Sequence, residues 1–224
     1  MRGDVEIIFV NDASTDGTSD ILEKIACDRG GLIVNSNGNK GQGAARNLGV
    51  AKASGDYFLF LDSDDELISP DFYLESLKLM QEAGYKAAKG YMQFFDPVKG
   101  YVLNKQDPRY NSVVMSSACG MVVSRDIFLK MGGFPESSVF RGKFGGEDVA
   151  FMQLLSKFVP DIAKVPLDAY KVWSRTGSHL DIFLSQTRIV ATEFEFVGIP
   201  ADQQSEYVKL SAEIDKYVKA NFRG

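Results

Sequence analysis

The chain has 224 residues and a formal net charge of −5, with 45% hydrophobic and 25% charged residues. This balance is typical of a globular protein with one large α/β domain or two small ones, and its acidic excess argues against a dominant nucleic-acid surface. No apolar run approaches the roughly 20 residues that cross a bilayer, no signal-peptide core is present, and the distant Cys27 and Cys119 are expected to stay reduced, so we expect a cytoplasmic protein.

The first half of the chain alternates short apolar runs with helical patterns. Runs rich in β-branched and aromatic residues predict strands at residues 5–10, 31–34 and 57–61. Helical spacing predicts helices around Ile21, Leu22 and Ile25, over residues 44–53, and from residue 69 onward. Such alternation predicts an α/β fold with a mostly parallel sheet flanked by helices.

Polar and acidic turns directly follow two of these strands. Residues 11–16 follow the first strand, and residues 62–65 follow the third. Ligands of such sheets bind at the carboxyl ends of the strands, so both turns are expected on the same rim.

The second half has an α+β pattern. A strand is predicted at residues 117–124 and a short helix at residues 125–131. Two glycines then precede a helix that begins near Glu147, and an amphipathic helix is predicted over residues 203–222.

The acidic turn after the third strand has the chemistry of a cation site. Asp62, Asp64 and Asp65 place three carboxylates within four residues, and their mutual repulsion is costly unless a cation neutralises it. Mg²⁺ or Mn²⁺ prefers such oxygen ligands and also binds phosphates. The alternative is a solvated turn that leads into a helix.

The glycine-rich loop at residues 39–47 precedes a predicted helix. Its backbone N–H groups and the helix dipole favour a phosphate, and Lys40 and Arg46 would add charge-assisted contacts. Its spacing matches neither a P-loop nor a dinucleotide fingerprint, so a plain glycine-rich turn is the alternative.

Glu147 and Asp148 directly follow Gly145 and Gly146. One interpretation is a general base in a glycine-hinged loop, oriented by the neighbouring acid; the other is a favourable pair of charges at a helix start. His179 is the single histidine, and a surface position is favoured over a metal ligand or an acceptor contact.

Taken together, these segments resemble the family 2 glycosyltransferases of the GT-A fold. The resemblance runs from about residue 6 to residue 178, in the family's order, through residues 6–18, 43–47, 61–65, 132–136 and 146–148. Each segment is modest alone, but the ordered set is specific. It implies one continuous domain, with residues 1–100 as the nucleotide-sugar-binding half and residues 101–224 as the acceptor-binding half with a C-terminal helix.

The resemblance also implies roles for the donor side. Asp12 would contact the nucleotide base, usually uracil, and Arg46 would lie near the nucleotide or its phosphates. Asp62 and Asp64 would be the DxD pair, with Asp64 favoured for the metal and Asp62 for the ribose or the metal.

On the acceptor side, Asp148 would deprotonate the acceptor hydroxyl and Glu147 would support it. The implied reaction is a single displacement that inverts the anomeric carbon, in polysaccharide biosynthesis. The implied partners are a nucleotide sugar, most often a UDP-sugar, and a saccharide or lipid-linked acceptor, with no nucleic acid. Peripheral attachment to the inner membrane face and a homodimer stay open.

One departure from the family concerns the first residues. The family normally begins about 30 residues earlier, so Met1 would fall just before the second strand, and the absent central strand would leave unpaired backbone edges. Two rival hypotheses therefore stand beside the enzyme. One is a non-catalytic remnant with a binding role. The other is a nucleotidyltransferase, which is disfavoured because attack by a phosphate needs no base.

Overall fold

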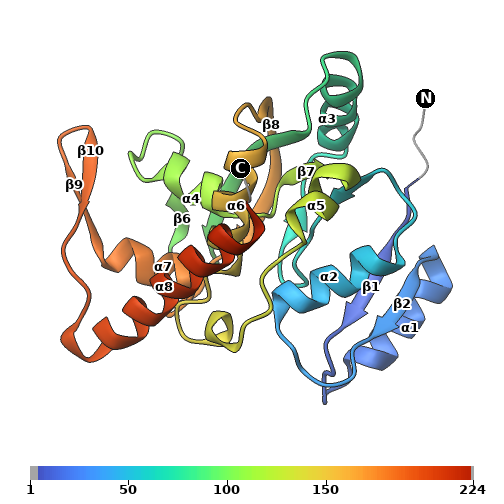
Figure 1. Ribbon diagram of the computed structural model, residues 1–224, viewed down its shortest axis with the longest axis horizontal. Coiled ribbons are helices and arrows are strands. Elements are labelled where there is room, and N and C mark those ends of the chain that lie inside the picture. Colours follow the sequence, from blue (N-terminus) through green and yellow to red (C-terminus); the bar gives the residue numbers. More distant parts are fainter. Residues whose placement is uncertain (1–4, 223–224) are drawn as a thin grey trace.

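The computed structural model describes residues 5–222 of the chain. At one end lies a small parallel pair, β1 (Ile8–Asn11) with β2 (Leu32–Asn35). The helices α1 (Thr18–Arg29) and α2 (Gln42–Lys52) lie beside this pair of strands, as Figure 1 shows in blue. Within residues 5–222, β2 is the only strand that pairs with β1, so the other edge of β1 carries no ladder.

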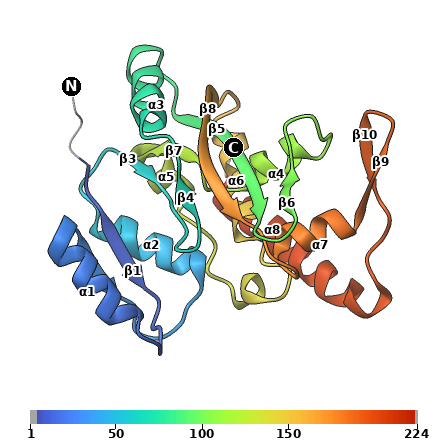
Figure 2. The ribbon, with the colours of Figure 1, turned by 180° about the vertical axis from the view of Figure 1, so that it is seen from behind.

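A second, larger sheet forms the centre of the molecule. Among the described residues it has six strands in the order β3-β7-β5-β8-β4, with β6 also pairing β5. The strands are β3 (Tyr57–Leu59), β4 (Glu66–Leu67), β5 (Ala87–Asp96), β6 (Gly100–Leu103), β7 (Met121–Ser124) and β8 (Ala163–Trp173). The long strands β5 and β8 lie side by side and run in parallel, as Figure 2 shows from behind.

Helices cover both faces of the central sheet. One core contains side chains of α2, α5 (Arg125–Met131), α6 (Glu147–Phe158) and α8 (Gln204–Asn221). The opposite core contains side chains of α3 (Asp71–Glu82) and α4 (Tyr110–Ser116). Along β7, Met121 and Val123 belong to the first core and Val122 to the second, because successive strand residues face opposite sides.

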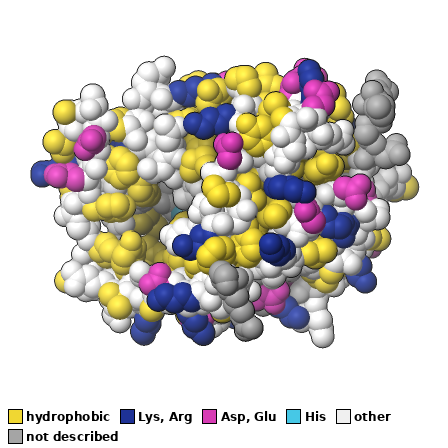
Figure 3. Space-filling model, turned by 45° about the horizontal axis from the view of Figure 1, so that its top comes forward, with side chains coloured by type: hydrophobic (Ala, Val, Ile, Leu, Met, Phe, Trp, Pro, Cys, Tyr) yellow, Lys and Arg dark blue, Asp and Glu magenta, His cyan; other side chains and the backbone are white. Residues whose placement is uncertain are grey.

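The segment between β8 and α8 extends the molecule on the side opposite β1 and β2. It contains α7 (His179–Ser185), the hairpin of β9 (Thr187–Val190) and β10 (Glu193–Phe196), and the 3₁₀ turn η2 (Ala201–Gln203). The 3₁₀ turn η1 (Ser138–Arg141) lies nearer the centre, beside the loop before α2. On the face shown in Figure 3, lysine and arginine side chains lie among acidic ones and do not gather in one patch.

The α/β fold class is confirmed, but the prediction of a mostly parallel sheet needs correction. The central sheet is mixed: β5 and β8 pair in parallel, whereas the β3–β7, β5–β7, β4–β8 and β5–β6 pairs are antiparallel. The reason is that β7 and β8 belong to the second half of the chain and insert into the sheet beside strands of the first half. Local patterns carry no information about that insertion.

The local predictions in the first half match elements with shifted ends. The strand expected at residues 5–10 is β1, which begins three residues later and is half-buried. The helix expected at residues 44–53 is α2, and the apolar face of α1 is largely open, with Ile21 and Ile25 exposed. The helix at residues 125–131 is confirmed as α5.

Candidate functional site

A buried arginine joins the acidic segments that the sequence places far apart. Arg46 lies on α2, and only 8% of its side chain is exposed. Its guanidinium donates to Asp62 Oδ1 at 2.8 Å and to Asp148 Oδ1 at 2.5 Å, and it lies 3.4 Å from Glu147 Oε1. Burial alone would lower the pKa of Arg46, but the carboxylates of Asp148 and Asp62 raise that pKa above its ordinary value. Arg46 is therefore a permanently charged hub for three acids.

The Arg46 guanidinium packs on the ring of Phe134. The Arg46 guanidinium lies 5.0 Å from the centre of the ring, which stacks on Phe151 at 4.1 Å in the core. Asn47, next along α2, exchanges hydrogen bonds with the backbone of Phe134 through both ends of its amide. The segment after α5 is thus tied to α2 at the point where Arg46 projects.

Glu147 and Asp148 form the first turn of α6. Gly145 and Gly146 precede them with φ of +56° and +101°, a conformation that glycine adopts without strain. Asp148 Oδ2 accepts the Ala118 N–H at 3.0 Å, so each oxygen of this carboxylate has a donor. Burial and the adjacent Asp148 raise the pKa of Glu147 to about 7.

The three aspartates of the turn at residues 62–65 have different surroundings. Asp62 points to Arg46, and its own N–H donates to the Tyr170 hydroxyl at 2.8 Å. Asp65 accepts the Trp173 N–H at 3.0 Å, and burial raises the pKa of Asp65 to about 6. Asp64 differs from both, since its side chain is 54% exposed.

A divalent cation fits this turn only in part. Within residues 5–222, no group of three or more His, Cys, Asp or Glu side chains is arranged to hold a metal ion. Among the described residues, the Asp64 carboxylate pairs with the exposed Arg175, at 3.1 Å. Such surface pairs contribute about 0–1 kcal/mol, so a cation can displace Arg175. Mg²⁺ commonly takes one or two carboxylates, substrate phosphates and waters, and the exposed Asp64 fits that pattern.

Asp12 ties the turn after β1 to the loop before α2. Its two carboxylate oxygens accept the Lys40 N–H at 3.0 Å, and one of them accepts the Gly41 N–H at 2.7 Å. The structure thus brings Asp12 and the backbone of Lys40 together at the start of α2.

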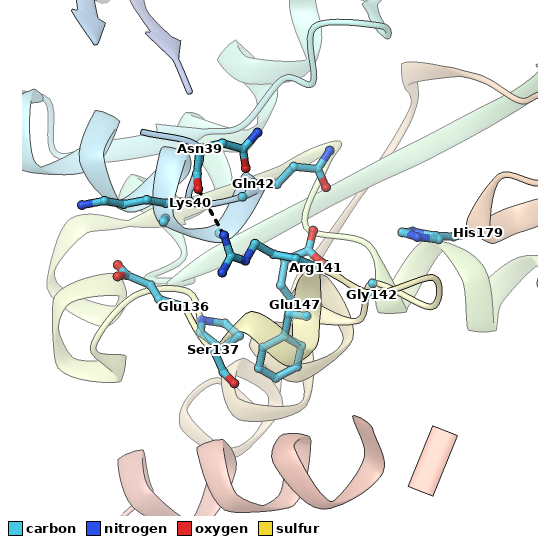
Figure 4. Close-up of a pocket in the computed structure, with 15 residues that line it drawn as sticks. Asn39, Lys40, Gln42, Glu136, Ser137, Arg141, Gly142, Glu147 and His179 are labelled. Carbon is cyan, nitrogen blue, oxygen red and sulfur yellow. Dashed lines mark hydrogen bonds between the residues drawn. The ribbon is translucent and has the colours of Figure 1, made fainter. Parts of the chain in front are cut away.

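A cavity of about 280 Å³ opens beside this helix start. Its walls include the loop at residues 39–44, the segment around η1, and Glu147. Figure 4 shows the Arg141 side chain crossing it toward Asn39, whose carbonyl oxygen accepts from the guanidinium at 3.1 Å. His179 lies at the other end from Lys40. The His179 side chain is exposed, as the sequence favoured, yet it lines this cavity.

Sequence reasoning missed four residues that position the site. They are Tyr170, which holds the backbone of Asp62; Ala118, which donates to Asp148; Arg175, which pairs with Asp64; and Arg141 in the cavity. All four come from the second half of the chain, where no local pattern marks them. Within the described part of the chain, no helix is long and apolar enough to cross a membrane.

Comparisons with known proteins place the chain in a family. The family model described as "Glycosyl transferase family 2" matches residues 1–131, more than half of the chain. The "Putative glycosyltransferase EpsH" of Bacillus subtilis is 42% identical over 74 residues, which is 33% of this chain and 21% of that protein. The Escherichia coli "UDP-Glc:alpha-D-GlcNAc-diphosphoundecaprenol beta-1,3-glucosyltransferase WfaP" is 46% identical over 61 residues, 27% of this chain and 24% of that protein. The chain thus matches about a quarter or less of the length of these two relatives.

Solved structures share the fold. Staphylococcus aureus TarS 1-349 in complex with UDP-GlcNAc matches with a TM-score of 0.63 at 20% identity, over 95% of this chain and 61% of that chain. The mannosyltransferase PcManGT from Pyrobaculum calidifontis, in complex with GDP-Man and Mn²⁺, matches with a TM-score of 0.58 at 15% identity, over 96% and 63%.

Proposed function

The chain belongs to glycosyl transferase family 2, and from that premise we propose that it moves a sugar from a nucleoside-diphosphate sugar to an acceptor hydroxyl. The observation that carries this proposal is the contact of Asp62 and Asp148 with the single guanidinium of Arg46. One of these acids follows a strand of the donor half, and the other begins a helix of the acceptor half. A donor and an acceptor bound to the two halves would therefore meet within one site.

The donor's diphosphate would lie at the start of α2. The backbone N–H groups of residues 42–44, in the first turn of α2, favour an anion, and the Lys40 side chain supplies a positive charge. Asp12 fixes the loop through the N–H groups of Lys40 and Gly41, and its remaining lone pairs can accept from the nucleotide base. UDP is the favoured nucleotide, since WfaP is described as a UDP-Glc-dependent glucosyltransferase and the TarS structure is a complex with UDP-GlcNAc.

Asp64, with Asp62, would hold Mg²⁺ or Mn²⁺ together with the diphosphate. When bound, such a cation supplies Lewis-acid stabilisation of the departing diphosphate. The exposure of Asp64 suits this role, because exchange of Arg175 for a cation leaves no buried group without a partner. Mn²⁺ is present in the complex of the structural neighbour PcManGT.

Asp148 would act as the base. Its side chain is 22% exposed and so can meet an acceptor, whereas Glu147 is buried. The acceptor oxygen forms a bond with the anomeric carbon as the carbon–oxygen bond to the diphosphate breaks. The diphosphate leaves with the bonding electrons, and the acceptor proton passes to Asp148. Attack from the face opposite the leaving group inverts the anomeric carbon.

Product analysis tests this proposal. Purified protein is incubated with UDP-sugars and Mn²⁺, with and without saccharide or lipid-linked acceptors, and the nucleotide product is identified by chromatography. We expect UDP, and we expect Asp148→Asn to lower turnover at least 100-fold while the Kd for UDP changes less than about twofold. Asp126→Asn is the matched control, because Asp126 is likewise the second residue of a helix but forms its ion pair with the exposed Lys86, away from Arg46.

Other outcomes would contradict the proposal. Release of pyrophosphate in a parallel incubation with UTP and sugar 1-phosphates would indicate a nucleotidyltransferase. Absence of metal-dependent UDP binding would indicate a non-catalytic binding protein. Loss of UDP affinity in Asp148→Asn would place Asp148 on the donor side of the reaction.

A further inference from the structure

A buried lysine lies behind the proposed base. Lys89 belongs to β5, and its side chain is almost completely buried, with 4% of the residue exposed. Its ammonium donates to the Ser117 carbonyl oxygen at 2.7 Å and also to the Cys119 carbonyl oxygen. No carboxylate among the described residues lies within ion-pair distance of it, so its bonds go to one short loop between α4 and β7.

Burial of the charged ammonium of Lys89 costs free energy, and no carboxylate among the described residues pairs with it to offset that cost. Burial lowers the pKa of Lys89 to about 8. Lys89 faces the same side of β5 as Ala87, whose side chain belongs to the apolar core around α5 and α6, where a methionine would be tolerated. The two carbonyl bonds are therefore the feature that requires an ammonium at this position.

These bonds lead to Asp148 through one peptide group. The Ser117 carbonyl and the Ala118 N–H belong to the same planar peptide unit, and in a trans peptide they point in opposite directions. Lys89 donates to one side of the unit, and Asp148 Oδ2 accepts from the other side at 3.0 Å. Hydrogen bonds in such a series polarise one another, so a charged donor on the carbonyl strengthens the N–H as a donor.

We propose that Lys89 is a positioning residue for Asp148. Through the carbonyl oxygens on either side of Ala118, its ammonium holds the Ala118 N–H against the carboxylate that receives the acceptor proton. This inference rests on the proposed function of Asp148. Arg46 holds the first oxygen of that carboxylate, and the Lys89–Ala118 relay holds the second.

The relay is tested with Lys89→Met, which keeps the length of the side chain and removes the donors. Lys164→Met is the control, because Lys164 pairs with Lys89 across β5 and β8 but is exposed. Exchange of the Ala118 amide hydrogen is followed by NMR, together with kcat, KM and the Kd for UDP. We expect exchange at Ala118 to accelerate at least 10-fold and kcat to fall about 10- to 100-fold, since a misplacement of about 1 Å can cost 100-fold. KM and Kd should change less than about twofold.

Two further variants keep the test decisive. Lys89→Gln retains a neutral donor and should recover part of kcat; it also replaces Lys89→Met if that variant does not fold. In an Asp148→Asn background, Lys89→Met should cause no additional loss, because both changes act on one group.

Three results would overturn the relay. They are unchanged exchange at Ala118, wild-type kcat in Lys89→Met, and a fall in kcat that is matched by a fall in UDP affinity. The amide measurement needs no turnover, so it still tests Lys89 if the wild-type protein transfers no sugar. In that case the proposed function fails separately.

Discussion

Replacement of Arg46 by methionine is the sharpest test of the site, because one cation holds three acids. Methionine retains an apolar stem that can stay over the Phe134 ring. The substitution leaves Asp62, Glu147 and Asp148 without a cation, in a region where their side chains are 9–24% exposed.

The expected loss follows from that geometry. Removal of one partner from a buried ion pair costs about 3–5 kcal/mol, because a charge is left uncompensated. For a chain of this length, 1 kcal/mol corresponds to roughly 2–4 °C in Tm, so Tm should fall by about 6–20 °C. Typical domains have about 5–15 kcal/mol of stability, so the variant should stay folded but be marginal.

The loss should also depend on pH, with a definite sign. Burial and the adjacent Asp148 raise the pKa of Glu147, and Arg46 opposes that rise, so removal of Arg46 raises the pKa of Glu147 further above that of the unfolded chain. The folded variant then binds protons more tightly than the unfolded chain, so its stability decreases as pH rises. The deficit relative to wild type should be largest near pH 7.5 and smaller near pH 5.5.

Urea unfolding at both pH values measures this effect, with Trp173 fluorescence and circular dichroism as probes. Arg125→Met is the matched control, because Arg125 also stacks on a phenylalanine, Phe58, at 4.9 Å but donates to the backbone carbonyls of Ala53 and Gly55. Its loss should be similar at the two pH values. A deficit below 1 kcal/mol for Arg46→Met at pH 7.5, or an equal deficit at both pH values, would refute the role of Arg46 as a hub.

Three other substitutions have defined outcomes. The pKa of Glu147 is raised from its ordinary 4.5 to about 7, so the folded protein holds this proton more tightly than the unfolded chain does. The free energy of unfolding of the wild type therefore decreases as pH rises above 4.5. Glu147→Gln should consequently gain stability relative to wild type as pH rises from about 4.5 to 7, and urea unfolding that shows the same difference at pH 5 and pH 8 would contradict this. Asp64→Ala should abolish the Mn²⁺-dependent part of UDP binding in calorimetry with little change in Tm, whereas undiminished binding would make the turn purely structural. Gly43→Ala places a Cβ 2.6 Å from the Pro135 carbonyl oxygen and should cost about 1–3 kcal/mol in thermal unfolding, while Gly17→Ala, with open space around it, should not.

Local sequence patterns were sufficient for elements whose ends depend on nearby residues. The segment at residues 125–131 becomes α5 as expected, and the helix expected near Glu147 begins at that residue, after two glycines with positive φ. The ordered motifs also predicted the family correctly, because each motif is a continuous run of residues.

The direction and order of the strands could not be predicted in this way. Strand β8 inserts between β5 and β4; its paired residues lie 75–78 positions earlier in β5 and 103–105 positions earlier in β4. Pairing between such distant segments is decided by the packing of both cores against the sheet. Periodicity within β8 reports only that alternate residues face opposite sides.

The sequence by itself determined which acids and which arginine are available for chemistry. Only the tertiary structure decided that Asp62 and Asp148, 86 positions apart, share the guanidinium of Arg46, and that Lys89 stands behind Ala118. The physical reason is that a buried charge must find its partners in space. Those partners come from whichever segments the fold brings to the same place, however far apart they lie along the chain.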